Sequence, residues 1–262
     1  MKDIIRQFVN IVAFLGMVTV NGLANTLPLN NIPTNEISDS FPNLFVPAGY
    51  VFAIWGVIYL ALLGFTVYQA LPSQRENPAL RRLGYWFAIS SVFNIAWLFA
   101  WHWLQFPLSL GIMIGLLISL IVIYLRLGIG RTSYTGIERW TLQVPFSIYL
   151  GWITVATIAN ASVVLLDAGW NAFGISPVVW AVVMLLIAAG LSIYITWTRR
   201  EVAYTLVIIW ALAGIVVAQM ETPVVAITAG VLAGVVALSL VISATRGLRA
   251  GGSGVQATPA AG

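Results

Sequence analysis

The chain has 262 residues, of which 60% are hydrophobic and 8% are charged, and its mean hydropathy is +0.97. A soluble domain carries roughly a quarter charged residues, so this composition predicts an integral membrane protein. The lack of cysteine and the single histidine exclude disulfide frameworks, thiolate metal sites and sites built on two histidines. The net charge of +4 is the balance of 12 Lys and Arg residues against 8 Asp and Glu residues. Because the basic residues do not cluster in one soluble segment, we expect no nucleic-acid partner.

Eight segments are apolar over about the 20 residues that a helix needs to cross a bilayer. The sequence therefore predicts an all-α fold, a polytopic membrane helix bundle. Pro107 and Pro223 begin two of its helices, where a missing backbone N–H costs nothing. The predicted spans, in chain order, are 7–25, 48–70, 84–104, 107–126, 139–166, 176–198, 202–219 and 223–245.

The charges predict the orientation of this bundle. All 12 Lys and Arg residues precede the first span or follow the second, fourth, sixth and eighth. The opposite loops contain only acidic charges, namely Glu36, Asp39, Asp167 and Glu221. Because Lys and Arg in short loops stay on the cytoplasmic side, both termini are predicted to be cytoplasmic. A prokaryotic cytoplasmic membrane is the natural location.

The two ends of the chain differ from the predicted bundle in composition. Lys2 and Arg6, followed by an apolar run, also resemble a cleavable signal peptide, but Asn10 and Asn21 interrupt that run and favour a retained helix. The small, polar tail 247–262 has low complexity and is predicted to be disordered. We therefore expect five helices in 1–167, three more in 168–246, and the tail.

Amides and aromatic residues recur at helical spacing inside three of the spans. An unpaired amide is costly in hydrocarbon, so such stripes should face other helices or a cavity. With Asn21 of the first span, they predict one aromatic, amide-bearing ligand site, mostly in the outer half of the membrane beneath the loop 26–47. The stripes are Trp55 and Tyr59 in the second span, Asn94, Trp97 and Trp101 in the third, and Trp152, Ala156 and Asn160 in the fifth.

Simpler roles are open for several of these residues. Asn94 and Asn160 can serve only to hydrogen-bond between helices. His102 lies at the outer boundary, and we expect an interfacial side chain there. Tryptophans near span ends commonly form the interfacial belt; the candidates are Trp101, Trp103, Trp140, Trp170, Trp180 and Trp197.

The stretch 47–64, PAGYVFAIWGVIYLALLG, resembles the second-helix signature of the tryptophan-rich sensory protein family, also called the translocator protein family. Two further motifs, on the third and fifth helices, resemble the same family in the same order. Together they cover roughly residues 1–167. The matching residues are Pro47, Trp55 and Tyr59, then Asn94, Ala96 and Trp97, then Trp152, Ala156, Thr157 and Asn160.

The chain departs from the family pattern in three places. Pro145 stands seven residues before Trp152, where the family has its proline four before, so we expect a differently shaped start of the fifth helix. Phe52 and Gly64 are each displaced by about one position. Three further helices in 169–245 exceed the family's five, which leaves open whether the usual homodimer surface is free.

The resemblance implies a five-helix bundle with a ligand pocket under the loop between its first two helices. Family members bind porphyrins and other tetrapyrroles, sterols and synthetic hydrophobic ligands. The expected partners are therefore the bilayer and a hydrophobic, planar ligand, with no resident cofactor. Because Glu36 and Asp39 lie in the outer loop without any Lys or Arg, carboxylate-rich porphyrins are disfavoured.

The sequence is compatible with three functions, of which ligand binding with a sensory or regulatory output is preferred. No charged residue lies deep in a predicted span, so we expect no catalytic residue, no metal site and no enzyme. A secondary transporter of a small hydrophobic solute is one alternative, disfavoured by the lack of intramembrane carboxylates. The other is a membrane scaffold whose extra helices bind a partner.

Overall fold

The computed structural model describes residues 1–27, 29–32 and 34–252, and all regular structure within these ranges is helical. The prediction of an all-α polytopic bundle is confirmed. The long helices are α1 (Lys2–Thr26), α3 (Ile54–Ala70), α5 (Trp86–His102), α6 (Phe106–Leu127), α8 (Val144–Asp167), α9 (Pro177–Arg199), α10 (Val202–Ala218) and α11 (Pro223–Gly252). The short elements are η1 (Leu29–Asn31), α2 (Thr34–Asp39), η2 (Gly49–Ala53), η3 (Pro72–Gln74), α4 (Pro78–Leu83), α7 (Gly136–Glu138), η4 (Arg139–Gln143) and η5 (Ala172–Gly174).

Among the described residues, six helical segments are long and apolar enough to cross a membrane: Lys2–Ala24, Gly49–Ala70, Phe106–Leu127, Gly136–Asp167, Pro177–Arg199 and Pro223–Arg246. α5 and α10 have 17 residues each. At about 1.5 Å per residue they reach roughly 26 Å, slightly less than the hydrocarbon core of about 30 Å. The total of eight spans therefore stays a prediction.

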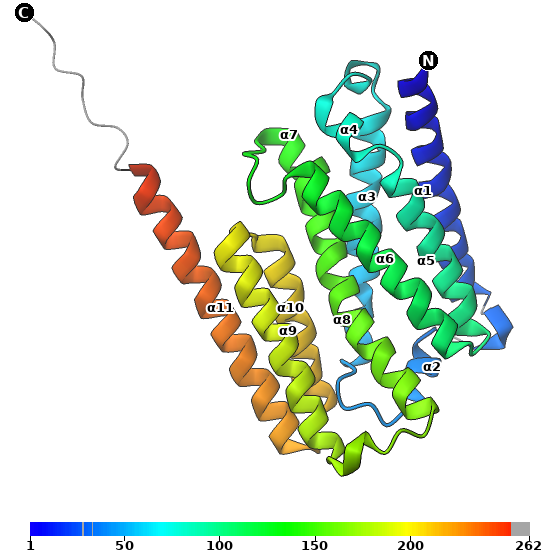
Figure 1. Ribbon diagram of the computed structural model, residues 1–262, viewed down its shortest axis with the longest axis vertical. Coiled ribbons are helices and arrows are strands. Elements are labelled where there is room, and N and C mark those ends of the chain that lie inside the picture. The colour runs from blue at the N-terminus through cyan, green and yellow to red at the C-terminus, as the bar shows by residue number, and fades with distance from the viewer. Residues whose placement is uncertain (28, 33, 253–262) are drawn as a thin grey trace, which may run out of the picture.

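The long helices form two groups (Figure 1). α1, α3, α5, α6 and α8 make a bundle, and α9, α10 and α11 pack against each other beside it, with α10 against α8. α1 begins and α11 ends toward the end of the molecule that carries α4 and α7. α11 runs to Gly252, into the tail that we predict to be disordered, and residues 253–262 of that tail lie outside the described residues. The division into domains at residue 167 stays a prediction.

Three phenylalanines fill the half of the five-helix bundle nearest α4. Phe65 of α3 contacts Phe87 of α5 and Phe146 of α8, with ring centroids 4.8 and 4.9 Å apart. None of the three has any exposed surface. Edge-to-face pairs of this kind stabilise by about 0.5–1.5 kcal/mol beyond area burial. This half of the bundle is therefore tightly packed around the three rings.

A π-helical turn, η4, lies between α7 and α8 and ends two residues before Pro145. A proline has no N–H to donate, and its ring clashes with the carbonyl four residues earlier, here that of Thr141. The wider turn avoids both problems, so the displaced proline does produce a differently shaped helix start. π-turns often occur at functional sites because they redirect side chains.

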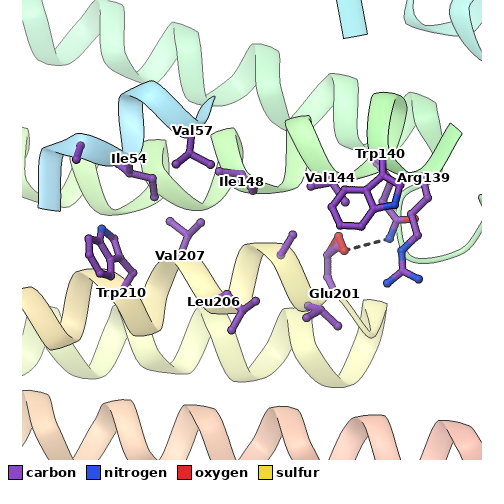
Figure 2. A pocket seen from close by; sticks show the side chains of 14 residues that line it. Ile54, Val57, Arg139, Trp140, Val144, Ile148, Glu201, Leu206, Val207 and Trp210 are labelled. Carbon is purple, nitrogen blue, oxygen red and sulfur yellow. Dashed lines mark hydrogen bonds between the residues drawn. The ribbon is translucent and has the colours of Figure 1, made fainter. Parts of the chain in front are cut away.

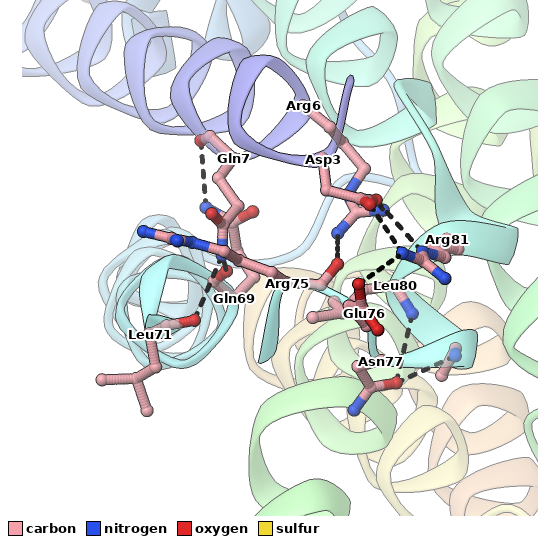
Figure 3. A network of polar contacts seen from close by, with 11 residues as sticks. Asp3, Arg6, Gln7, Gln69, Leu71, Arg75, Glu76, Asn77, Leu80 and Arg81 are labelled. Carbon is pink, nitrogen blue, oxygen red and sulfur yellow. Dashed lines mark hydrogen bonds and ion pairs between the residues drawn. The ribbon is translucent and has the colours of Figure 1, made fainter. Parts of the chain in front are cut away.

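A polar network fixes the first turns of α1 to the neighbouring chain (Figure 3). The Asp3 carboxylate accepts from Arg6 and Arg81, both at 2.7 Å. Gln7 Nε2 donates to the Gln69 carbonyl at 2.6 Å, and Gln69 Nε2 donates back to the Gln7 carbonyl at 3.2 Å. α1 is therefore joined to both α3 and α4 at this end.

The three C-terminal helices contact the bundle closely at η2. The Gly214 carbonyl of α10 accepts from the Ala48 N–H at 3.1 Å, and a Cβ at Gly214 would overlap the Val51 side chain. Trp210 Nε1 also donates to the Val51 carbonyl, at 3.2 Å. α10 thus supports η2, which carries Phe52 into the interior.

Candidate functional site

The predicted stripes converge at the end of the bundle covered by α2 and η2. Two small cavities lie there, of about 180 Å³ and about 60 Å³, and both are lined by Thr34, Phe52, Trp55 and Trp97. Eight of the nine predicted site residues line one or both cavities. The larger includes Asn21, Trp55, Tyr59 and Trp97; the smaller includes Trp55, Trp97, Trp101, Trp152, Ala156 and Asn160.

Indole faces form much of the walls. The Trp55 ring stacks on Tyr59 at 5.6 Å between centroids and meets the Trp152 ring edge-on at 6.3 Å. Trp97 stacks on Trp101 at 5.7 Å. α3, α5 and α8 therefore present flat, apolar surfaces to one region, as their helical spacing predicts.

Asn94 is the predicted site residue that lines neither cavity. Its Oδ1 accepts from Asn21 Nδ2 at 2.7 Å, and its Nδ2 donates to the Tyr149 hydroxyl at 2.9 Å. The side chain has no exposed surface. It joins α1, α5 and α8, which is the interhelical role that the sequence left open.

Asn160 combines both roles. Its Oδ1 accepts from Trp97 Nε1 at 3.1 Å, and its Nδ2 donates to the Ser109 hydroxyl at 3.0 Å. Asn160 also lines the smaller cavity. By holding the Trp97 indole, it fixes the angle of one aromatic wall.

Trp152 carries a buried donor without a partner. Its indole N–H has no hydrogen-bond acceptor within the described part of the chain, and the residue is 3% exposed. Leaving such a group unpaired costs about 1–3 kcal/mol. Trp152 lines the smaller cavity, so the unpaired donor belongs to the same site as the stacked indoles.

The segment around α2 is attached to the end of α5. Trp101 Nε1 donates to the Thr34 carbonyl at 3.3 Å, and His102 Nε2 lies 3.1 Å from the Thr34 hydroxyl. His102 Nδ1 lies 2.7 Å from the Leu98 carbonyl. Since that carbonyl can only accept, a neutral imidazole carries its proton on Nδ1 and accepts from Thr34 through Nε2.

These contacts correct two sequence expectations. The prediction that His102 is an interfacial side chain is wrong, because the segment carrying Thr34 covers it and leaves no exposed surface. Trp101 is 4% exposed and lines the smaller cavity, so it belongs to the interior and not to an interfacial belt.

Sequence reasoning missed three residues of this region. Thr34 begins the short helix α2 in the loop between α1 and α3, where helical periodicity does not predict which side chains face the bundle. Tyr149 has a readable signal, since it precedes Trp152 by three residues on the same stripe. Phe52 was noted only for its displacement, and its position in η2 lets it line both cavities.

Glu201 was missed as well. Beside Arg199 and Arg200 it looks like a solvated loop residue, yet it is 2% exposed. Its carboxylate accepts from Gln143 Nε2 at 3.1 Å and from the Ser147 hydroxyl. Burial raises the pKa of the Glu201 carboxyl, and the bonds from Ser147 and Gln143 offset part of that rise. Over the residues that the structure describes, no group of three His, Cys, Asp or Glu gathers as a metal site requires.

Stacked indoles and buried amides inside a bundle of apolar helices define a class, the polytopic membrane proteins with an internal aromatic site. A family model described as TSPO-like protein matches residues 7–242, and the chain belongs to this family. The match continues past residue 167, where the motif resemblance ends, so α9, α10 and most of α11 lie within the matched region. No curated protein and no solved structure matches the chain. The family indicates an integral membrane protein with a ligand-binding or transport role.

Proposed function

We propose that this TSPO-like protein binds a hydrophobic, planar small molecule, such as a tetrapyrrole or a sterol-like compound, in the aromatic region under α2. Binding, without catalysis, would serve a sensory, regulatory or transport role. The observation that carries the proposal is the unpaired Trp152 N–H, which is buried beside the Trp55 indole at the wall of the smaller cavity.

The chemistry of the walls suits a flat apolar ligand. Conjugated or fused rings would stack on the Trp55 and Trp97 faces, and an acceptor atom on the ligand would take the Trp152 N–H. A few well-placed polar groups in an apolar site are what fix a ligand's orientation. Glu36 lies in α2, so we favour neutral planar molecules over carboxylate-rich porphyrins.

Ligand entry requires the two cavities to merge. Their volumes, about 180 and 60 Å³, lie below the roughly 300–1,000 Å³ typical of small-molecule sites. Phe52 and Trp55 line both cavities, so rotation of these two rings would join the cavities. The contacts of Thr34 with Trp101 and His102 would then have to give way, and α2 would shift outward.

A fluorescence titration tests the proposal. We expect saturable quenching of tryptophan emission when protoporphyrin dimethyl ester is added to purified protein in lipid nanodiscs. Trp152→Phe keeps an aromatic ring and removes the donor, so the affinity should fall about two- to thirteenfold, since a neutral hydrogen bond contributes about 0.5–1.5 kcal/mol. Trp197→Phe on α9, which lines neither cavity, should leave the affinity unchanged.

Two further comparisons locate the ligand. Trp55→Ala and Trp97→Ala should each weaken binding at least as much as Trp152→Phe. The free diacid should bind less tightly than the dimethyl ester if Glu36 disfavours anions. Parent-like affinity in both alanine variants would show that the ligand lies elsewhere.

Transport is the second candidate, and Glu201 is the observation that favours it. Ionisable groups buried in membrane proteins commonly mark ion or proton pathways. Reconstituted protein would then move a hydrophobic solute across liposomes, and the flux would collapse when the proton gradient is abolished. Flux that is insensitive to both the gradient and Glu201→Gln would remove this candidate.

A further inference from the structure

A cavity of about 620 Å³, larger than both aromatic cavities, lies on the flank of the bundle. It runs between α3, η4 with the start of α8, and α10 (Figure 2). We call it the flank groove. Its walls are mainly aliphatic, and its lining includes Val57, Arg139, Trp140, Gln143, Glu201 and Leu206. It shares no lining residue with the aromatic cavities.

The groove opens at the surface of the bundle. Val57 of α3 and Leu206 of α10 are both 52% exposed, although they line it. In a bilayer this opening meets lipid, because the exposed residues at its edge, Val57 and Leu206, are apolar and both helices are mostly apolar. An occupant would therefore enter sideways, with a hydrophobic body, and the volume falls within the usual range for small-molecule sites.

One end of the groove is polar. Figure 2 shows Glu201 at the same end as Arg139 and Trp140, with Trp210 at the other end. The Glu201 carboxylate accepts from Gln143 and Ser147. Within the described residues the ion pairs involve only Asp3 and Glu76 as acids, so no cationic nitrogen lies within 4.0 Å of Glu201.

The charges decide which kind of amphiphile fits. A buried carboxylate is costly unless a positive charge pairs with it. The exposed Arg139 acts on Glu201 only beyond ion-pair distance. An anion entering the groove would be repelled by Glu201, and a neutral acyl chain would leave the carboxylate without a counter-charge.

We propose that the flank groove binds a lipophilic organic cation. Its hydrophobic body would lie between α3 and α10, and its charge beside the Glu201 carboxylate, where the Trp140 indole adds a cation–π surface. This site is independent of the aromatic site under α2, because the two have no lining residue in common.

A pair of ions with nearly the same shape and opposite charge tests the proposal. Tetraphenylphosphonium and tetraphenylborate would be measured by equilibrium dialysis against the full-length protein in phosphatidylcholine nanodiscs, with empty nanodiscs subtracted. We expect one saturable site for tetraphenylphosphonium and at least about tenfold weaker saturable binding of tetraphenylborate. Neither ion titrates, so the difference reports the charge of the site.

Two variants and their matched controls locate that site. Glu201→Gln keeps a hydrogen-bonding side chain without the charge and should weaken tetraphenylphosphonium binding at least about tenfold, as expected for loss of a buried charge partner. Leu206→Trp should weaken it by filling the groove. The exposed Glu221→Gln and Leu186→Trp, outside the groove, should bind like the parent. Trp97→Ala should also bind like the parent, even if it abolishes ligand binding under α2.

Several results would overturn the proposal. They are the lack of a saturable site, equal binding of the two ions, or parent-like binding in a folded Glu201→Gln protein. If Glu201→Gln does not fold, as judged by gel filtration, unchanged binding in Leu206→Trp would also overturn the proposal. A co-purified phospholipid that tetraphenylphosphonium cannot displace would make the groove a lipid site instead.

Discussion

Asn94 accepts from Asn21 and donates to Tyr149, so one amide joins three helices. Asn10, in contrast, is buried without such a bridge in the part of the chain that the structure describes. It is 1% exposed, and its Oδ1 has no hydrogen-bond donor among the described residues. The two asparagines therefore contribute differently to the stability of the fold, and replacing each of them with leucine should have different effects.

Asn94→Leu is expected to lower the free energy of unfolding by about 0.6–2 kcal/mol, the range of an interhelical hydrogen bond in a membrane protein. Asn10→Leu removes a buried acceptor without a donor, so stability should be unchanged or higher. Melting temperatures in one detergent check both. Equal losses in the two variants would contradict the assignment of Asn94 as an interhelical bridge.

The Glu201 carboxyl predicts a pH effect on stability. Burial raises its pKa above the ordinary value of 4.5, so the folded protein holds this proton to a higher pH than the unfolded chain does. The stability contributed by Glu201 is present below about pH 4.5 and is lost as the pH rises through the raised pKa. Among the described residues, Arg139 and the Tyr124 hydroxyl of α6 interact electrostatically with this carboxyl.

Glu201→Gln should therefore melt at a higher temperature than the parent at pH 7, and the difference should shrink at pH 4. Because the variant is compared with the parent at each pH, the effects of the other titrating groups on stability cancel. Melting curves at several pH values provide the measurement. A variant that is less stable than the parent at pH 7 would show that the charged form of Glu201 supports the fold.

At the level of elements, apolar length and prolines locate the helices well. The predicted span 107–126 is observed as Phe106–Leu127, and 176–198 as Pro177–Arg199. Helical spacing also placed Trp55, Trp97 and Trp152 around one region. It could not place Thr34 or Glu201, because each lies outside the long helices and is buried only by tertiary contacts.

The contact between α10 and η2 gives an element-scale prediction. A Cβ at Gly214 would overlap Val51 and approach Pro47 at 3.0 Å. Gly214→Ala should therefore destabilise the protein by about 1–3 kcal/mol, as overpacking typically does. Gly190→Ala on α9, where a Cβ meets nothing within 4 Å, should be neutral or stabilising because alanine favours helix.

Ligand binding extends this test from stability to the site. Because η2 carries Phe52 to the aromatic cavities, Gly214→Ala should also weaken ligand binding under α2, whereas Gly190→Ala should not. Thermal unfolding and the fluorescence titration measure the two effects separately. A Gly214→Ala protein with parent-like stability would mean that α10 and η2 are not in close contact.

At the scale of the whole molecule, the charges separate along the axis of the bundle. α4 and α7 lie at the end where α1 begins, and the loops there carry the arginines. Glu36 and Glu221 belong to loops of the opposite, arginine-free end. We therefore predict a single orientation with every basic loop in the cytoplasm, which requires the short helices α5 and α10 to cross the membrane.

Cysteine labelling tests this orientation directly, since the chain contains no cysteine of its own. Single cysteines at the exposed positions Ser73, Ser133, Asn171 and Glu221 sample two loops at each end. In intact cells a membrane-impermeant maleimide should label Asn171→Cys and Glu221→Cys, while Ser73→Cys and Ser133→Cys react only after permeabilisation.

Because Ser73 and Ser133 are separated by α5 and α6, labelling of one alone in intact cells would mean that α5 does not span the bilayer. Likewise, Asn171 and Glu221 are separated by α9 and α10, so a difference between them would show that α10 does not cross.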